Sequence, residues 1–159
     1  MVIRRFDREP VTGFVIPGAY LLPEGVEVLS QSGSIVLIPY GEVKAVCFVR
    51  DFDAVSLPPD RKTFQTRPKA EGLWVRMRFA DGEIMDGLLP NNLLEPEPFG
   101  FTVVPPSPSS NNQKIFVPRS ALTEFQVVGV IGSPIHRRKP KPEHGGQLEM
   151  FGEETGPPR

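Results

Sequence analysis

The sequence contains one pattern twice, and this duplication limits the fold more than any other feature. The first copy has the pattern at Arg5, Phe6, Glu9, Val11, Gly13, Gly25 to Val28, Ile35 to Pro39, Val43, Val46, Phe48 and Val49. The second copy has it at Arg78, Phe79, Glu83, Met85, Gly87, Gly100 to Val103, Lys114 to Pro118, Leu122, Phe125, Val127 and Val128. Self-similarity of this kind indicates one supersecondary unit used twice.

Polar and apolar residues alternate in each copy, as is typical of half-buried strands. The alternation is clearest in Val2–Phe6 and Leu73–Phe79. A turn follows each stretch, at Asp7-Arg8-Glu9 in the first copy and at Asp81-Gly82 in the second. Asp-Gly between two such stretches is a strong hairpin signal. Each copy is therefore predicted to open with a β-hairpin.

Glycine and proline mark the remaining strands. Gly13 and Gly87 lie inside the second strand, where a glycine predicts a bulge or a tight bend. Pro39 and Pro118 cannot donate to a sheet ladder, so we expect them at a corner between the fourth and fifth strands. The other strands are expected to begin at Gly25 and Gly100, at Ile35 and Lys114, and to cover about 43–50 and 122–130. No ten-residue stretch has helical periodicity, so the predicted fold is all-β, with two five-stranded units.

Composition divides the chain into two folded units and two polar segments. We expect the units at residues 1–53 and 72–132. Residues 54–71 are polar and contain proline, which predicts a linker. Residues 133–159 are too poor in apolar residues to build a core, so we expect a disordered tail.

Charge and cysteine content argue against several classes of protein. The net charge is −1, which is not the strongly basic balance of a typical nucleic-acid-binding domain. Cys47 is the single cysteine, so no disulfide forms within the chain. It aligns with Gln126, which predicts a small filler at a contact surface. No apolar stretch reaches the length of a membrane span, and we expect a cytoplasmic protein.

The sequence offers no machinery for catalysis. Both histidines, His136 and His144, lie in the tail without a cysteine nearby, which argues against a metal site and against a nucleophile–histidine pair in the folded units. No glycine-rich phosphate loop follows a strand. We therefore expect no enzymatic activity and no cofactor.

The second copy opens with Arg78-Phe79-Ala80-Asp81-Gly82-Glu83 followed by Asp86-Gly87, and the first copy has Asp7-Arg8 at the same turn. Together with a closing apolar strand, a one-turn corner and a further apolar strand, this pattern resembles the Sm-like small β-barrel of bacterial RNA chaperones of the host-factor type. The resemblance covers about two-thirds of the chain. It implies two tandem five-stranded small barrels.

The Sm-like family binds single-stranded RNA through an Asp–Asn pair before the third strand and an Arg-Gly at the corner after the fourth. This chain departs at both places, with Asn91 and Asn92 in the loop and Tyr40 or Arg119 at the corners. Tyr40 could stack on a base and Arg119 could contact a phosphate. The alternative is that these are exposed turn residues.

The tail contains Gln147, Leu148, Glu149, Met150 and Phe151 in succession. This peptide resembles the short motif with which bacterial replication and repair proteins dock on the DNA sliding clamp. An apolar groove would bury its three large side chains, each worth about 1.5–3 kcal/mol when fully buried. The alternative is that these side chains fold back onto the body.

A short basic run precedes the peptide and includes Arg137, Arg138 and Lys139. Beside a clamp it could contact duplex phosphates, and otherwise it keeps a linker soluble and extended. The sequence thus predicts a non-enzymatic adaptor recruited by the sliding clamp. The two alternatives are a regulator that binds single-stranded RNA or DNA, and a scaffold that pairs through exposed strand edges, including pairing into a homo-oligomer.

Overall fold

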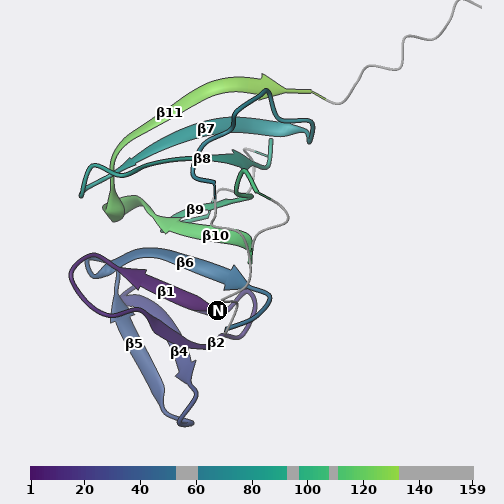
Figure 1. Cartoon of the computed structure of the whole chain (residues 1–159). Helices are drawn as coiled ribbons and strands as arrows, with labels where there is room; N and C mark the ends of the chain where they lie inside the picture. The colour runs from purple at the N-terminus through teal and green to yellow at the C-terminus, as the bar shows by residue number, and fades with distance from the viewer. Residues whose placement is uncertain (53–60, 93–96, 108–110, 133–159) are drawn as a thin grey trace, which may run out of the picture.

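The computed structural model describes residues 1–52, 61–92, 97–107 and 111–132 (Figure 1). Within these ranges the protein is all-β, as predicted. The first copy forms β1 (Val2–Arg5), β2 (Val11–Phe14), β3 (Leu21–Leu22), β4 (Gly25–Ser30), β5 (Ile35–Pro39) and β6 (Val43–Val49). The second copy forms β7 (Gly72–Phe79), β8 (Ile84–Leu89), β9 (Gly100–Val103), β10 (Asn112–Pro118), the 3-10 turn η1 (Arg119–Ala121) and β11 (Leu122–Ile131).

The two copies have the same strand order. In the first copy the pairing runs β5–β4–β2–β1–β6, with the short β3 added beside β4. In the second copy it runs β10–β9–β8–β7–β11, where a single bridge between Leu88 and Val104 joins the β8 and β9 segments. Pairing within the described residues joins neither β5 to β6 nor β10 to β11. Each copy is therefore a curled sheet, and two closed barrels are not observed.

Strand pairing corrects the sequence alignment of the first strands by one residue. Ile3 pairs with Val46 and Val11, and Met77 pairs with the corresponding residues of the second copy. Ile3 is therefore equivalent to Met77, and Arg5 to Phe79 rather than to Arg78. The sequence analysis aligned the two Arg-Phe pairs because their residues are identical. In the structure the equivalent residues are those whose side chains face the same side of the sheet.

β6, the last strand of the first copy, pairs with β10, the last strand but one of the second copy. β6 and β10 are antiparallel, with Val46 opposite Phe116 and Cys47 opposite Ile115. Figure 1 shows β6 of the lower half lying against β10 of the upper half. The hydrogen-bonded path thus runs through the whole molecule and ends at β5 and at β11.

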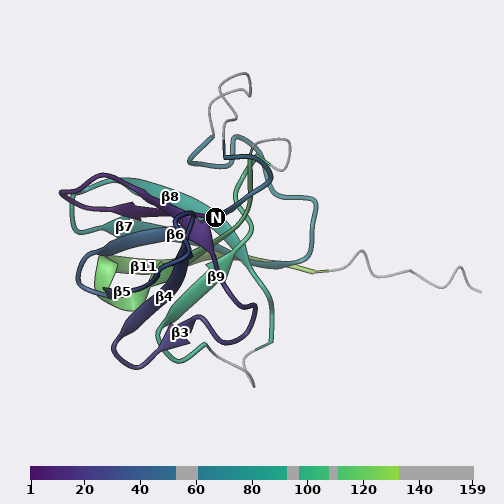
Figure 2. The ribbon, with the colours of Figure 1, turned by 90° about the horizontal axis from the view of Figure 1, so that it is seen from below.

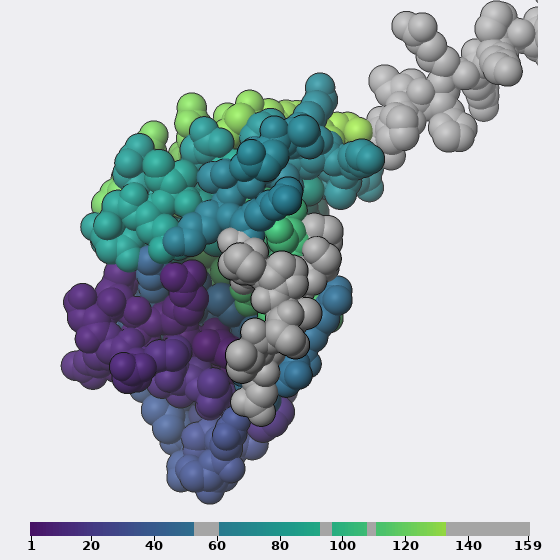
Figure 3. Space-filling view, viewed as in Figure 1, coloured from purple at the N-terminus to yellow at the C-terminus, as the bar shows by residue number. Residues whose placement is uncertain are grey.

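The two copies exchange side chains across this junction. Phe116 comes from β10 but is fully buried in the core of the first copy, beside Val43 and Val46. Ala45 and Cys47 come from β6 but are buried in the core of the second copy. Each core is therefore completed by a strand of the other copy, and the space-filling view shows one continuous body (Figure 3).

Duplicated glycines allow close approach of neighbouring strands. A Cβ on Gly25 would lie 2.2 Å from the carbonyl oxygen of Ile38, and one on Gly100 would lie 2.2 Å from that of Val117. Gly13 on β2 is crowded in the same way by β4, and Gly87 on β8 is crowded by β9. Neither Gly13 nor Gly87 has a positive φ, so their role is tight packing.

Part of the expected linker packs onto the second sheet. The buried carboxylate of Asp86 accepts hydrogen bonds from the guanidinium of Arg76 and from the backbone N–H of Phe64. The Asp86 backbone N–H donates to the carbonyl oxygen of Lys62, and the ring of Phe64 meets Trp74 edge to face. Residues 61–71 therefore belong to the folded body. No helix among the described residues has the length and apolar character needed to cross a membrane.

We predict that Gly100→Ala lowers the free energy of unfolding by about 1–3 kcal/mol, because the new Cβ forces β9 away from β10. Gly25→Ala meets the equivalent carbonyl and is expected to cost a similar amount. Gly41→Ala is the control: nothing lies within 4 Å of its Cβ position, so its effect stays within about 0.5 kcal/mol. Urea unfolding of the three variants measures this. Equal stability of all three would contradict the close approach.

Candidate functional site

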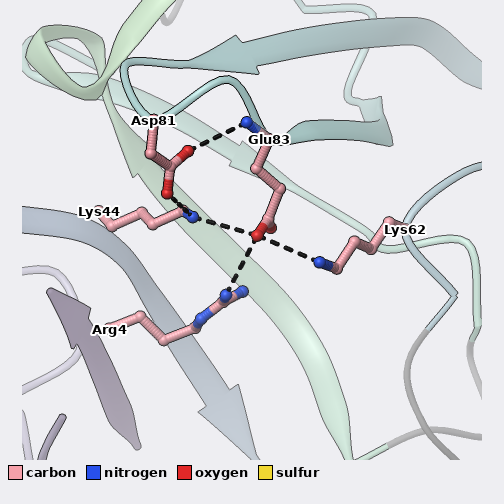
Figure 4. Close-up of polar contacts among 5 residues, drawn as sticks. All are labelled: Arg4, Lys44, Lys62, Asp81 and Glu83. Atoms are coloured by element: carbon pink, nitrogen blue, oxygen red, sulfur yellow. Dashed lines mark hydrogen bonds and ion pairs between the residues drawn. The ribbon is translucent and has the colours of Figure 1, made fainter. Parts of the chain in front are cut away.

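A network of charged side chains lies at the junction of the two copies (Figure 4). Lys44 on β6 is almost fully buried and bonds to Asp81 and Glu83, which flank the β7–β8 turn. Its Nζ lies 3.1 Å from Glu83 Oε2. The same carboxylate oxygen also lies 3.5 Å from Arg4 Nη2 and 3.1 Å from Lys62 Nζ. Three basic residues from three separate segments thus converge on one turn.

The network holds both carboxylates in their charged form. The hydrogen bond from Lys44 is the main cause of the lowered pKa of Asp81. Burial pushes the pKa of Glu83 upward, but hydrogen bonds from Lys44 and Lys62 and the charge of Arg4 outweigh burial, so the net pKa is lowered. A carboxylate with a lowered pKa is a poor proton donor or acceptor near neutral pH. The contacts of Arg4 and Lys44 with Asp81 and Glu83 join the two copies by charge.

The structure brings two of the predicted nucleic-acid contacts to adjacent corners. Tyr40 follows β5 and Arg119 follows β10, and the hydroxyl of Ser120 lies 3.3 Å from the Tyr40 carbonyl oxygen. Tyr40 is already engaged, because its ring stacks on Phe99 and its hydroxyl donates to the Leu22 carbonyl oxygen. Arg119 is exposed, with its guanidinium over the ring of Phe101. Of these two predicted contacts, Arg119 is the one that presents an accessible charge.

Asn91 and Asn92 lie apart from those corners. They line a groove of about 570 Å³ with Leu88, Val104 and Ile131. Val104 follows the end of β9, whereas Tyr40 stacks beside its beginning. The predicted nucleic-acid contacts that the structure describes therefore lie at two separate places.

The remaining predicted contacts lie outside the described residues. They are the clamp-like peptide residues Gln147, Leu148, Met150 and Phe151, and the basic residues Arg137, Arg138 and Lys139. Within the described ranges no group of three metal-ligating side chains occurs. Cys47, predicted from its alignment with Gln126 to be a small filler at a contact surface, is buried at the junction of the copies.

Exposed apolar side chains gather on the two strands that end the hydrogen-bonded path. On β5 they are Ile35, Val36 and Leu37; on β11 they are Val127, Val128 and Val130. The sequence analysis predicted exposed strand edges in general but named none of these six residues. The available signal was that both stretches are apolar on consecutive residues, which places apolar side chains on both faces of a strand.

We predict that Lys44→Met lowers the free energy of unfolding at neutral pH by about 1–3 kcal/mol, because it leaves Asp81 and Glu83 without their buried cation. A carboxylate whose pKa is lower in the folded state than in the unfolded state stabilises the fold at pH values above its unfolded pKa, near 4. This stabilisation is lost as the pH falls through the folded-state pKa. The wild type should therefore lose more stability on acidification below about pH 4 than Lys44→Met does.

Lys62→Met is the matched control, because Lys62 contacts the same carboxylate but its side chain is 55% exposed. Its cost should stay below about 1 kcal/mol. Urea unfolding from pH 7 to pH 3 makes the comparison. Parallel pH profiles for the wild type and Lys44→Met would show that the network does not stabilise the fold.

Comparison with known proteins gives one match. No curated protein and no solved structure matches the chain. The match is to a protein family and covers residues 1–129, which include both copies of the repeat up to the last part of β11. The chain therefore belongs to the family of unknown function DUF6982.

Proposed function

We propose that this protein is a non-enzymatic adaptor that docks on the bacterial DNA sliding clamp through Gln147–Phe151. The observation that carries the proposal is the peptide itself, in which all five positions fit the clamp-binding pattern. Leu148, Met150 and Phe151 would fill an apolar groove, and the Gln147 amide would fix the register.

The position of the peptide in the chain is compatible with this assignment. Among the described residues, both core clusters consist of residues between Met1 and Ile131. The peptide begins at residue 147, and residues 133–146 separate it from the last described residue, Gly132. At about 3.3–3.6 Å per residue, that segment spans at most about 50 Å when extended. The peptide can therefore reach a groove on a clamp without contact between clamp and body.

The expected affinity is modest. Burial of three large side chains contributes about 1.5–3 kcal/mol each, and the ordering of the segment offsets much of this gain. A dissociation constant in the micromolar range, about −8 kcal/mol, is the result. Such a contact recruits a protein without fixing it permanently.

We predict that changing Leu148 and Phe151 together to Ala weakens clamp binding at least about 100-fold, because two buried anchors are lost. Calorimetric titration of the full chain with a purified bacterial clamp measures this. Glu149→Ala is the control, since that position is variable in the motif and should leave affinity within about threefold. An unchanged affinity of the double variant would refute the proposed role of the peptide.

The second candidate function is binding of single-stranded nucleic acid by two Sm-like units. The shared strand order and the one-turn corner at η1 support the Sm-like assignment. The contact of Ser120, the residue after Arg119, with the Tyr40 carbonyl oxygen brings the two corners together and favours a contact there. Asn91 and Asn92 lie in a separate groove, so any contact would be limited to the paired corners.

For this candidate we expect Arg119→Ala to weaken binding of a labelled oligouridine about 5- to 10-fold at low salt and to reduce the salt slope by about one. Arg67→Ala is the control, because Arg67 is exposed but contacts Val130 instead of the corners. Filter binding decides the question. A wild-type protein that retains neither oligouridine nor oligothymidine would exclude this function.

A further inference from the structure

The two ends of the hydrogen-bonded strand path are open edges with apolar side chains. Among the residues that the structure describes, β5 pairs only with β4 and β11 pairs only with β7. β5 lies at the bottom of Figure 1 and β11 at the top, and Figure 2 views the molecule from the β5 end. Ile35 is 70% exposed, Leu37 44% and Val127 50%. An open edge of this kind is a template for pairing with another strand.

The junction inside the molecule shows which strand fits each edge. β6, the last strand of the first copy, pairs there with β10, the last strand but one of the second copy. Counted from the shared proline, β5 is equivalent to β10 and β11 is equivalent to β6. The open edges are therefore the two partners of the internal junction, each lacking its mate. We infer that β11 of one molecule pairs with β5 of a second copy of this chain, in the manner of β6 with β10.

Differences in exposure between equivalent residues support this inference. Val127 and Val130 lie on the core side of the β7–β11 pair, opposite buried Val75 and half-buried Leu73. Both side chains are nevertheless at least half exposed. Phe48, the equivalent of Val127, is half-buried, because β10 lies beside its strand. β11 lacks such a covering strand among the described residues. A second β5 supplies one.

The same comparison holds on the other edge. Val36 is 40% exposed, whereas its equivalent Ile115 is 5% exposed. Ile115 lies opposite Cys47 of β6, which covers it at the internal junction. In the pair between molecules Gln126 takes the place of Cys47 and lies over Val36.

The internal register predicts the contacts between molecules. Phe116 opposite Val46 becomes Leu37 opposite Phe125 of the second copy, and Lys114 opposite Phe48 becomes Ile35 opposite its Val127. Leu37 thus takes the position of Phe116 and closes the core side of β11. Arg78 and Glu9 occupy the positions equivalent to the ion-paired Arg4 and Glu83, and within one molecule Arg78 pairs with Glu124.

The chemistry of the edges suits reversible association. β5 carries no charged residue that would oppose pairing. β11 carries Glu124 and Gln126 where β6 has the buried Ala45 and Cys47, so the junction between molecules is more polar than the internal one. Interfaces between separately stable proteins are typically more polar than permanent ones. Because each molecule uses two different edges, association is head to tail and extends beyond a dimer.

Sedimentation velocity of the full chain tests this inference. Between about 1 and 200 μM, the weight-average mass of the wild type should rise to at least twice the 17.6 kDa of one chain. Leu37→Lys on β5 and Val127→Lys on β11 should each abolish the rise, because each places a charge in the paired edge. Ile16→Lys, at an exposed residue that belongs to neither strand, should associate like the wild type.

A mixture of the two edge variants gives the decisive result. Leu37→Lys keeps a working β11, and Val127→Lys keeps a working β5. The equimolar mixture should therefore form dimers, and no larger species, since the remaining two edges are both blocked. Thermal melting within about 3 °C of the wild type establishes that each variant is folded.

Three results would overturn the inference. A wild type that stays monomeric at 200 μM shows that the edges do not pair with each other. Association that survives either variant shows that another surface is responsible. A mixture that stays monomeric although the wild type associates shows that β5 and β11 are not partners. Clamp binding does not enter this test, so its outcome is independent of the proposed function.

Discussion

The antiparallel pairing of β6 with β10 is the interaction on which the rest of the structure depends. It joins the two copies by backbone hydrogen bonds and directs Phe116 into one core and Ala45 and Cys47 into the other. A half-molecule would expose these side chains and leave each core incomplete. The buried Lys44 and its two carboxylates reinforce the same junction from the β7–β8 turn. Duplication has thus produced one continuous folded body in place of two separate domains.

This junction also explains where the molecule remains open. A unit with one edge of each kind, when duplicated in tandem, satisfies one pair of edges internally and leaves one pair free. Among the described residues the free pair is β5 and β11, and the exposed Val36 and Leu37 of β5 are equivalent to Ile115 and Phe116, which the internal pair buries. With the proposed function, a protein built in this way would separate two tasks. The sheet would supply assembly, and Gln147–Phe151 would supply the contact with the clamp. If the chains associate, each assembly carries one such peptide per chain, which raises the effective concentration of the motif.

Much of the strand content was accessible to sequence reasoning because it depends on local chemistry. Alternation predicted β1 and β7, Pro39 and Pro118 predicted the corners, and Gly25 and Gly100 predicted the starts of β4 and β9. Three features were missed for identifiable reasons. The two-residue β3 is too short to show a period. The packing of residues 61–71 depends on Asp86, whose buried role is invisible until Arg76 and the backbone of Phe64 are placed beside it. The first-strand alignment followed matching Arg-Phe letters, whereas the fold aligns residues that face the core.

The sequence by itself determined the all-β class, the duplication and the position of most strands, because period and turn chemistry are properties of neighbouring residues. Only the tertiary structure decided that the two copies share strands and side chains, that Lys44 is buried between them, and that β5 and β11 are the open edges. Pairing between strands far apart in the chain is set by long-range packing, and apolar stretches such as β5 and β10 look alike until a neighbouring strand covers one and leaves the other exposed.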